Sequence, residues 1–199
     1  PEGGVHAFGK QRTDRGGIWY TAQSGIWQTA WLESTADNYV RSLRLIPDFD
    51  GKCLRYAVRA EDPAGARVTV LCGGRVVARS WADERGEGVC PIPAEHFCPW
   101  SPEDPYLYDL EVTLPSGDRV ESYFGMRQFS VMEHRGRRVL ALNHRPCFQS
   151  GLLDQGYWSD GLYTPPADEA MVWDIQTARD MGFNMLRKHI KIEPLRWYY

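Results

Sequence analysis

The sequence predicts a mainly β protein with a two-sheet sandwich in the middle of the chain. From about Ser34 to Phe129, short stretches alternate apolar and polar residues, and turn-forming residues separate them. About seven such strands fall within roughly a hundred residues, and no long helical pattern interrupts them. This arrangement is typical of an immunoglobulin-like β-sandwich, whose two antiparallel sheets bury their apolar faces against each other. Different patterns precede and follow this region.

Two parts of the middle region carry the strand signal most clearly. Residues 54–60 place three large apolar side chains on one side and two arginines on the other, as expected for a half-buried strand. Residues 67–72 and 75–81 flank Gly73-Gly74. Two glycines between two alternating stretches predict a hairpin with a primed two-residue turn.

The residues before the sandwich also read as strand. Residues 18–33 are rich in aromatic and β-branched side chains, and Trp27, Thr29 and Trp31 would point to one side. A strand of this length cannot build a core alone. We therefore expect 1–33 to be the end of a β domain that begins earlier. The tryptophans could instead form a platform for a sugar, although strand core is the favoured interpretation.

The pattern changes again after Phe129. Residues 129–133 and 138–142 are expected to pair as a hairpin, and 148–153 to form a short apolar strand. Residues 168–181 have a helical period, and 183–189 read as a buried strand. Strand, helix and strand of this length predict a parallel βαβ unit, the start of an α/β fold. Two parallel strands leave sheet edges and faces uncovered, so we expect the sequence to be physically incomplete at both ends.

Composition excludes several classes of protein. The net charge is −3 with a pI of about 6.0, and no basic stripe suggests nucleic-acid binding. No run of 18 apolar residues predicts a membrane helix. The five cysteines include no CxxC pair, so we expect no metal site and free thiols. No glycine-rich phosphate loop follows a strand, and no cofactor is expected. The compartment stays open, with the cytoplasm slightly favoured.

Three regions of the sequence resemble one enzyme family. They are residues 20–33, residues 104–110 with 124–127, and residues 142–146 with 182–189. In this order they resemble the last strands of a sugar-binding jelly roll, the last strands of an immunoglobulin-like domain and the entry into a catalytic TIM (β/α)8 barrel. The family is glycoside hydrolase family 2, the β-galactosidase, β-glucuronidase and β-mannosidase group. The resemblance implies domains at 1–33, 34–129 and 130–199, of which the first and last are incomplete.

The resemblance implies a retaining exo-β-glycosidase that hydrolyses O-glycosidic bonds in carbohydrates. Such enzymes use two carboxylic acids about 5–5.5 Å apart, one as acid/base and one as nucleophile. In the family both are glutamates on later barrel strands, and the first belongs to an Asn-Glu pair, which this sequence lacks. A whole barrel needs about 250 residues. We therefore expect no catalytic residue in this chain, a carbohydrate substrate for the full-length protein, and leave open whether that protein is a homo-oligomer.

The first βα loop, residues 154–166, holds four candidate substrate-binding residues, because barrel active sites lie on such loops. Asp154 is the first choice for accepting a hydrogen bond from a sugar hydroxyl, and a loop or helix-capping role is its alternative. Gln155 and Asp160 are weaker candidates, since both stand beside glycines as turn residues do. Trp158 could stack on a sugar face or close the barrel mouth.

The second predicted barrel strand ends near two further candidates, Arg187 and His189. The resemblance places Arg187 beneath the active site, where it would pair with the nucleophilic carboxylate and keep it ionised. A plain structural ion pair is the alternative. His189 could donate to a substrate hydroxyl, but in the β-galactosidase pattern the histidine lies one residue later. His189 and Glu193 could suggest a metal pair, which Pro194 and the lack of a third ligand argue against.

Two other functions compete with the enzyme. A non-catalytic carbohydrate-binding module would need a whole jelly roll, whereas only its last strands are expected in residues 1–33. A purely structural spacer is the simplest interpretation of residues 34–129 taken alone. Sugar binding by this chain would separate the module from the spacer.

Overall fold

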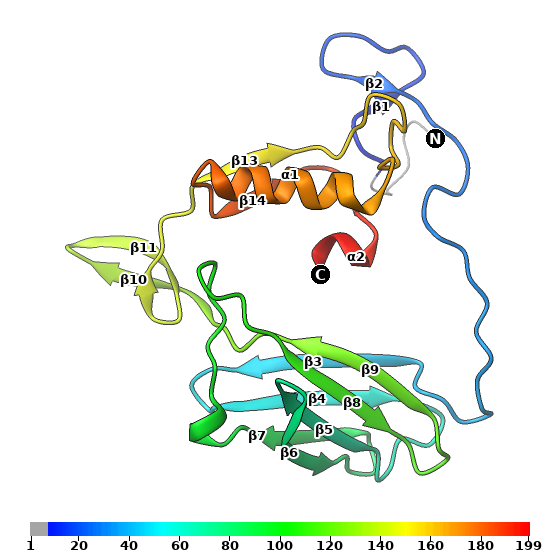
Figure 1. Ribbon diagram of the computed structural model, residues 1–199, viewed down its shortest axis with the longest axis vertical. Helices are drawn as coiled ribbons and strands as arrows, with labels where there is room; N and C mark the ends of the chain where they lie inside the picture. The colour runs from blue at the N-terminus through cyan, green and yellow to red at the C-terminus, as the bar shows by residue number, and fades with distance from the viewer. Residues whose placement is uncertain (1–7) are drawn as a thin grey trace. The chain divides into compact units, whose positions relative to one another are not determined.

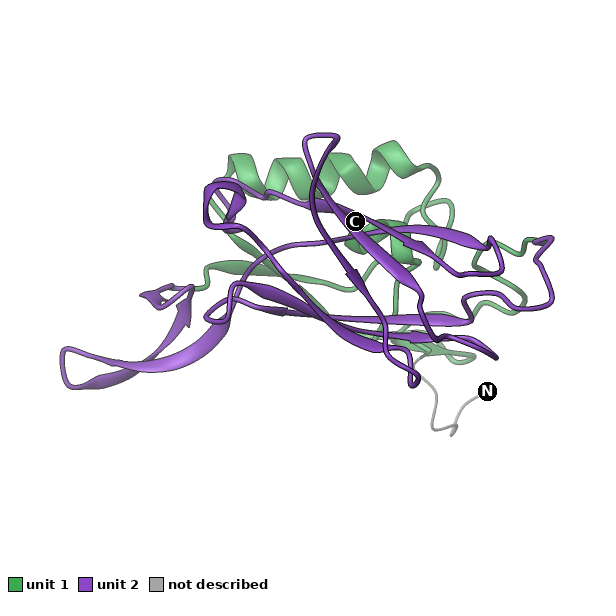
Figure 2. Cartoon of the chain, turned by 90° about the horizontal axis from the view of Figure 1, so that it is seen from below, with its two compact units in different colours: residues 1–32, 149–199 green, residues 33–148 purple. Residues whose placement is uncertain are grey.

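The computed structural model describes residues 8–199 (Figure 1). The chain forms two compact units (Figure 2). One unit is residues 33–148, and the other combines the described residues up to Leu32 with Gln149–Tyr199. Within residues 8–199, no helix is long and apolar enough to cross a membrane.

The unit of residues 33–148 contains a β-sandwich of two antiparallel sheets. A three-stranded sheet has the order β3-β4-β7, and a four-stranded sheet has the order β6-β5-β8-β9. The bounds are β3 Ser42–Asp48, β4 Cys53–Arg59, β5 Arg67–Cys72, β6 Arg75–Trp81, β7 Glu87–Pro91, β8 Tyr108–Thr113 and β9 Arg119–Phe124. The predicted mainly β class and the sandwich are therefore confirmed.

The predicted glycine turn joins β5 to β6. Gly73 and Gly74 have φ of +56° and +76°, the left-handed region that a primed hairpin turn requires at both central positions. A side chain at either position would be strained, which is why the two glycines predict this hairpin well.

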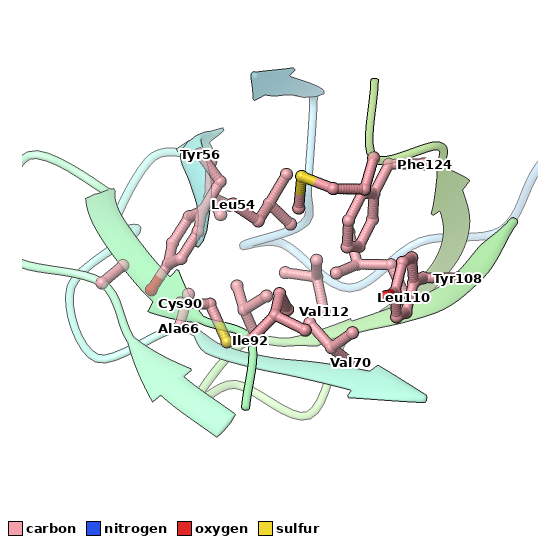
Figure 3. Close-up of a cluster of buried hydrophobic side chains, with 14 of the residues drawn as sticks. Leu54, Tyr56, Ala66, Val70, Cys90, Ile92, Tyr108, Leu110, Val112 and Phe124 are labelled. Atoms are coloured by element: carbon pink, nitrogen blue, oxygen red, sulfur yellow. The ribbon is translucent and has the colours of Figure 1, made fainter. Parts of the chain in front are cut away.

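The core of the sandwich lies between its two sheets (Figure 3). Leu54 and Val58 of β4 are 0% exposed, and so are Val68 and Val70 of β5. Burying each such side chain contributes roughly 1.5–3 kcal/mol. The alternation of apolar residues along the strands thus places one face of each sheet in this core.

Tyr108 ties a connecting segment into the core. Its hydroxyl donates to the His96 carbonyl at 2.6 Å and accepts from the Cys98 amide at 2.6 Å, just after the 3-10 helix Ala94–His96. Its ring stacks on Phe124, with centroids 4.9 Å apart and planes 10° apart. Burial raises the pKa of Tyr108 to about 12.

A hairpin follows the sandwich within the same unit. Strands β10 (Phe129–His134) and β11 (Arg137–Leu142) pair antiparallel across Arg135 and Gly136, as predicted, and β12 (Arg145–Pro146) adds to β11. Asn143 fixes the base of this hairpin. Its side chain accepts from the Gln128 amide and donates to the Trp100 carbonyl, both at 2.9 Å.

The second unit contains the predicted βαβ element. Strands β13 (Gly151–Asp154) and β14 (Met185–Lys188) pair in parallel, and helix α1 (Asp168–Asp180) connects them. Gly182, at φ +88°, follows the helix, and its amide donates to the Arg179 carbonyl. This left-handed glycine ends α1 as the sequence predicts. The short helix α2 (Leu195–Tyr198) follows β14.

One local prediction for this unit is wrong. Of residues 18–33, only Tyr20–Thr21 form a strand, β2, which pairs in parallel with β1 (Gln11–Arg12). Trp19 makes an isolated bridge with Gly16, and the residues of 18–33 outside β2 form no strand. In α1, Met171 and Ala178 are buried, whereas Trp173 and Met181 are 66% and 68% exposed.

Candidate functional site

The ends of the two parallel strands meet, and they bring Asp154 beside Lys188. These residues are register partners at the ends of β13 and β14. The His189 amide donates to the Asp154 carbonyl at 2.8 Å, which extends the pairing by one residue. The parallel ladder therefore fixes the backbone from which the Asp154 side chain projects.

The Asp154 carboxylate is held at both oxygens. Oδ1 accepts from the Gly156 amide at 2.8 Å, and Oδ2 accepts from Lys188 Nζ at 2.8 Å. The side chain is 22% exposed. Each carboxylate oxygen can accept a second hydrogen bond. Asp154 thus combines a fixed orientation with spare acceptor capacity, which a sugar hydroxyl could use.

Asp154 belongs to a cluster of four charged side chains, which we call the ion cluster: Asp154, Lys188, Lys191 and Glu193. Glu193 Oε1 lies 2.6 Å from Lys188 Nζ and 3.1 Å from Lys191 Nζ. The side chain of Lys191 is 0% exposed and that of Glu193 is 2% exposed. Burial lowers the pKa of Lys191, and the neighbouring Glu193 opposes that shift.

Sequence reasoning missed the ion cluster. It singled out neither Lys188 nor Lys191, and it considered Glu193 only as a metal ligand. One signal was available, because Lys191 and Glu193 alternate with Ile190 and Ile192. In an extended segment this alternation places both charges on one side, where they can meet.

A cavity of about 510 Å³ lies beside Asp154. Its polar wall includes Asp154, Gln155, Trp158 and Asp174, while residues of β13 and α1 form its apolar wall. The structure therefore brings three of the six predicted residues together at one cavity. Burial raises the pKa of Asp174, the charge of Asp154 raises it further, and Lys188 opposes the shift.

The other three predicted residues do not line this cavity. Asp160 is exposed and its carboxylate accepts from the Gly161 amide at 3.0 Å, a contact typical of a turn. Arg187 is exposed, pairs in register with Leu153, and makes no ion pair within residues 8–199. Successive strand residues face opposite sides, so Arg187 and Lys188 project to different faces.

His189 is half-buried just beyond β14. Burial lowers its pKa, and the positive charges of Lys10 and Arg187 lower it further. The imidazole is therefore held in its neutral form, which can both donate and accept hydrogen bonds near neutral pH. Within the described residues, no group of three metal-ligating side chains is found. Glu193 is engaged with two lysines, which leaves His189 without the suggested metal partner.

Aromatic side chains connect the loop after β13 to the N-terminal segment of the same unit. Tyr157 stacks on Tyr20, with centroids 3.9 Å apart, and Tyr163 meets Trp27 edge to face at 4.5 Å. The Tyr163 amide donates to the Gln23 side chain at 3.0 Å. Trp27 therefore packs against the loop rather than within a sheet.

Comparison with known proteins finds similarity to one enzyme family. The family model described as "Glycosyl hydrolases family 2" matches residues 39–127, which span the sandwich. The sandwich is therefore similar to the domain that this family model describes. A β-galactosidase from Leuconostoc mesenteroides is 27% identical over 139 residues, covering 66% of this chain and 12% of that protein. A β-galactosidase from Streptococcus thermophilus is 24% identical over 162 residues, covering 78% of this chain and 14% of that protein.

Solved structures of β-glucuronidases extend the likeness beyond the sandwich. A β-glucuronidase from Faecalibacterium prausnitzii has a TM-score of 0.64 at 28% identity, over 76% of this chain and 24% of that chain. A β-glucuronidase from Ruminococcus gnavus has a TM-score of 0.70 at 18% identity, over 81% of this chain and 27% of that chain. The second likeness shows the fold alone. The chain spans only 12% to 14% of the length of the curated relatives it matches.

Proposed function

We propose that this chain is part of a longer retaining exo-β-glycosidase that cleaves terminal sugars from β-glycosides. The family match over the sandwich carries this proposal. The relatives named above are β-galactosidases and β-glucuronidases much longer than this chain. A family of glycosidases thus supplies the reaction class, and the sugar itself is left to experiment.

The proposed architecture is that of the family. Residues 1–33 would close a jelly roll, 34–129 form the sandwich, and 130–199 begin a TIM barrel. The parallel pair β13–β14 with α1 outside it is the repeating unit of such a barrel. Apolar side chains on this unit support the proposal, since Leu153 is 52% exposed and Trp173 is 66% exposed. Neighbouring barrel strands and helices would cover them.

In the proposed mechanism, two glutamates supplied by later barrel strands perform the chemistry. One protonates the leaving oxygen while the other attacks the anomeric carbon, and water then releases the sugar. No catalytic residue is assigned within this chain. Arg187, which has no ion-pair partner within residues 8–199, would pair with the nucleophile and keep that carboxylate ionised.

The loop after β13 would bind the sugar. Asp154 would accept a hydroxyl hydrogen bond, because its fixed carboxylate retains acceptor capacity. Trp158 would stack on a sugar face, and Gln155 would donate from its amide. His189 would hydrogen-bond a second hydroxyl. Asp160 is the weakest of the six, since it contacts only its own turn.

Hydrolysis of aryl β-glycosides tests this function. The longer protein should turn over at least one aryl β-galactoside, β-glucuronide or β-mannoside, and the 199-residue chain alone should turn over none. Asp154→Asn in the longer protein should raise KM, because a neutral amide oxygen binds a hydroxyl more weakly. Saturable sugar binding by this chain, with no turnover by the longer protein, would instead support a carbohydrate-binding module.

A further inference from the structure

Lys191 fixes the loop between β13 and α1 at two separate points. Its Nζ donates to the Gly156 carbonyl at 2.5 Å and to the Tyr163 carbonyl at 2.7 Å. The third ammonium hydrogen is directed to Glu193 Oε1, at 3.1 Å. An ammonium has three donors, so all the hydrogen-bonding capacity of this buried side chain is used. The loop can shift at Gly156 or Tyr163 only if these bonds break.

The backbone at Gly156 packs directly on the Lys191–Glu193 pair. Gly156 has φ of +62°, and a Cβ added there would clash with Glu193 Oε1 and lie 2.9 Å from Lys191 Nζ. No side chain separates the loop from the ion pair at this point. The ion pair therefore fixes the position of the loop backbone at Gly156 relative to the end of β14.

The ion cluster connects this contact to Asp154. Glu193 Oε1 bridges Lys191 to Lys188, and Lys188 Nζ continues to Asp154 Oδ2. The four charges alternate in sign and sum to zero. Removing one of the buried charges would leave its neighbour uncompensated, whereas removing a lysine and glutamate together would keep the cluster neutral.

We propose that Lys191 and Glu193 are positioning residues for the sugar site, which hold the loop that carries Gln155 and Trp158 and orient the Asp154 carboxylate through Lys188, without touching the sugar. The inference rests on the proposed function and adds two residues to it. A buried ion pair contributes little net stability, because desolvation offsets its attraction. Its fixed geometry can instead orient the groups bonded to it, and here those groups are the loop carbonyls and the Asp154 carboxylate.

Variants of the longer protein test this proposal. Lys191→Met and Glu193→Gln each remove one charge, and the double variant removes both. We expect KM for the best aryl glycoside to rise about 10- to 100-fold in all three, because displaced binding groups weaken contacts with the sugar. A purely structural role predicts that the neutral double variant recovers both thermal stability and KM. Positioning predicts that it recovers stability alone.

Arg196→Met is the matched control. Arg196 Nε pairs with Asp168 at 2.7 Å in the same unit, but both side chains are exposed. This variant should leave KM unchanged. If a single variant fails to fold, the neutral double variant still decides between the two roles.

Hydrogen exchange separates failure of this proposal from failure of the proposed function. Peptides covering residues 155–164 should exchange faster in the double variant, while those of β4 should not change. Unchanged exchange in the loop, or faster exchange with an unchanged KM, overturns the positioning role. If the unaltered longer protein hydrolyses no aryl glycoside, the proposed function fails, and loop exchange still tests whether the ion pair holds the loop.

Discussion

Tyr20 and Tyr157 stack face to face, with ring centroids 3.9 Å apart and planes 11° apart. The Tyr157 hydroxyl also donates to the Thr21 carbonyl at 3.4 Å. These contacts join β2, near the start of the chain, to the loop after β13. Burial and the neighbouring tyrosines Tyr163 and Tyr20 raise the pKa of Tyr157 to about 12.

Removing this stack should loosen β2. We expect Tyr157→Leu to lower the opening free energy of the Tyr20 and Thr21 amides by about 1 kcal/mol, the typical contribution of an aromatic pair. Hydrogen exchange at these amides measures it. Tyr157→Phe retains the ring and loses only the long hydroxyl contact, so its effect should be smaller. Equal effects from the two variants would show that stacking does not hold β2.

Gly156→Ala should destabilise the unit that contains the loop more than Gly136→Ala destabilises the hairpin β10–β11. Both glycines have positive φ, +62° and +72°, so both alanines cost about 1–2 kcal/mol of backbone strain. Only at Gly156 would the new Cβ clash, with Glu193 Oε1. Local hydrogen exchange should therefore show the larger loss at Gly156. Equal losses of stability would mean that the side chains of the ion cluster move away from the new Cβ at little energetic cost.

Tyr108→Phe should destabilise the sandwich by about 1–3 kcal/mol, because it leaves the His96 carbonyl and Cys98 amide without their buried partner. Urea-dependent hydrogen exchange at β4 and β8 reports this unit separately. Tyr106→Phe is the control. The Tyr106 hydroxyl donates to Cys72 Sγ, a weak acceptor, so this variant should cost less. A larger loss from Tyr106→Phe would contradict the assignment.

His189 should titrate below its ordinary value of 6.5, owing to partial burial and the charges of Lys10 and Arg187. The unfolded chain then binds this proton at a higher pH than the folded chain. The contribution of His189 to the free energy of unfolding is therefore fully present above pH 6.5. It falls as the pH drops from 6.5 to the pKa of the folded state. NMR titration measures the pKa.

Replacing Arg187 tests the cause of the His189 shift. Arg187→Gln should move the pKa of His189 upward, since one nearby positive charge is lost. Arg12→Gln is the control, because the Arg12 guanidinium stacks on Trp19 at 3.8 Å and does not contribute to the shift. A pKa at or above 6.5 in the unaltered chain would contradict the assignment.

The sandwich could be predicted from the sequence because its signals are local. Alternation along β4 and β5 and the glycines at 73 and 74 each specify structure within a few residues. Residues 18–33 carried a strand pattern for another reason. Trp27 packs on Tyr163, far along the chain, and an aromatic-rich segment looks the same whether its partner is a strand or a loop.

The candidate site could be predicted only in part. Asp154 was found because it follows an apolar strand, and parallel strands bring their ends together. The burial of Lys191 and Glu193 depends on carbonyls and charges supplied by distant residues, and sequence alone gives charged side chains a strong expectation of exposure. The substrate roles of the six site residues stay predictions.

The stereochemistry of the reaction tests the central claim most directly. Proton NMR can record which anomer the longer protein releases first from an aryl β-glycoside, before mutarotation mixes the two. A retaining glycosidase forms a covalent intermediate and should release the β anomer first. Release of the α anomer first, or no hydrolysis of any aryl β-glycoside, would contradict the account.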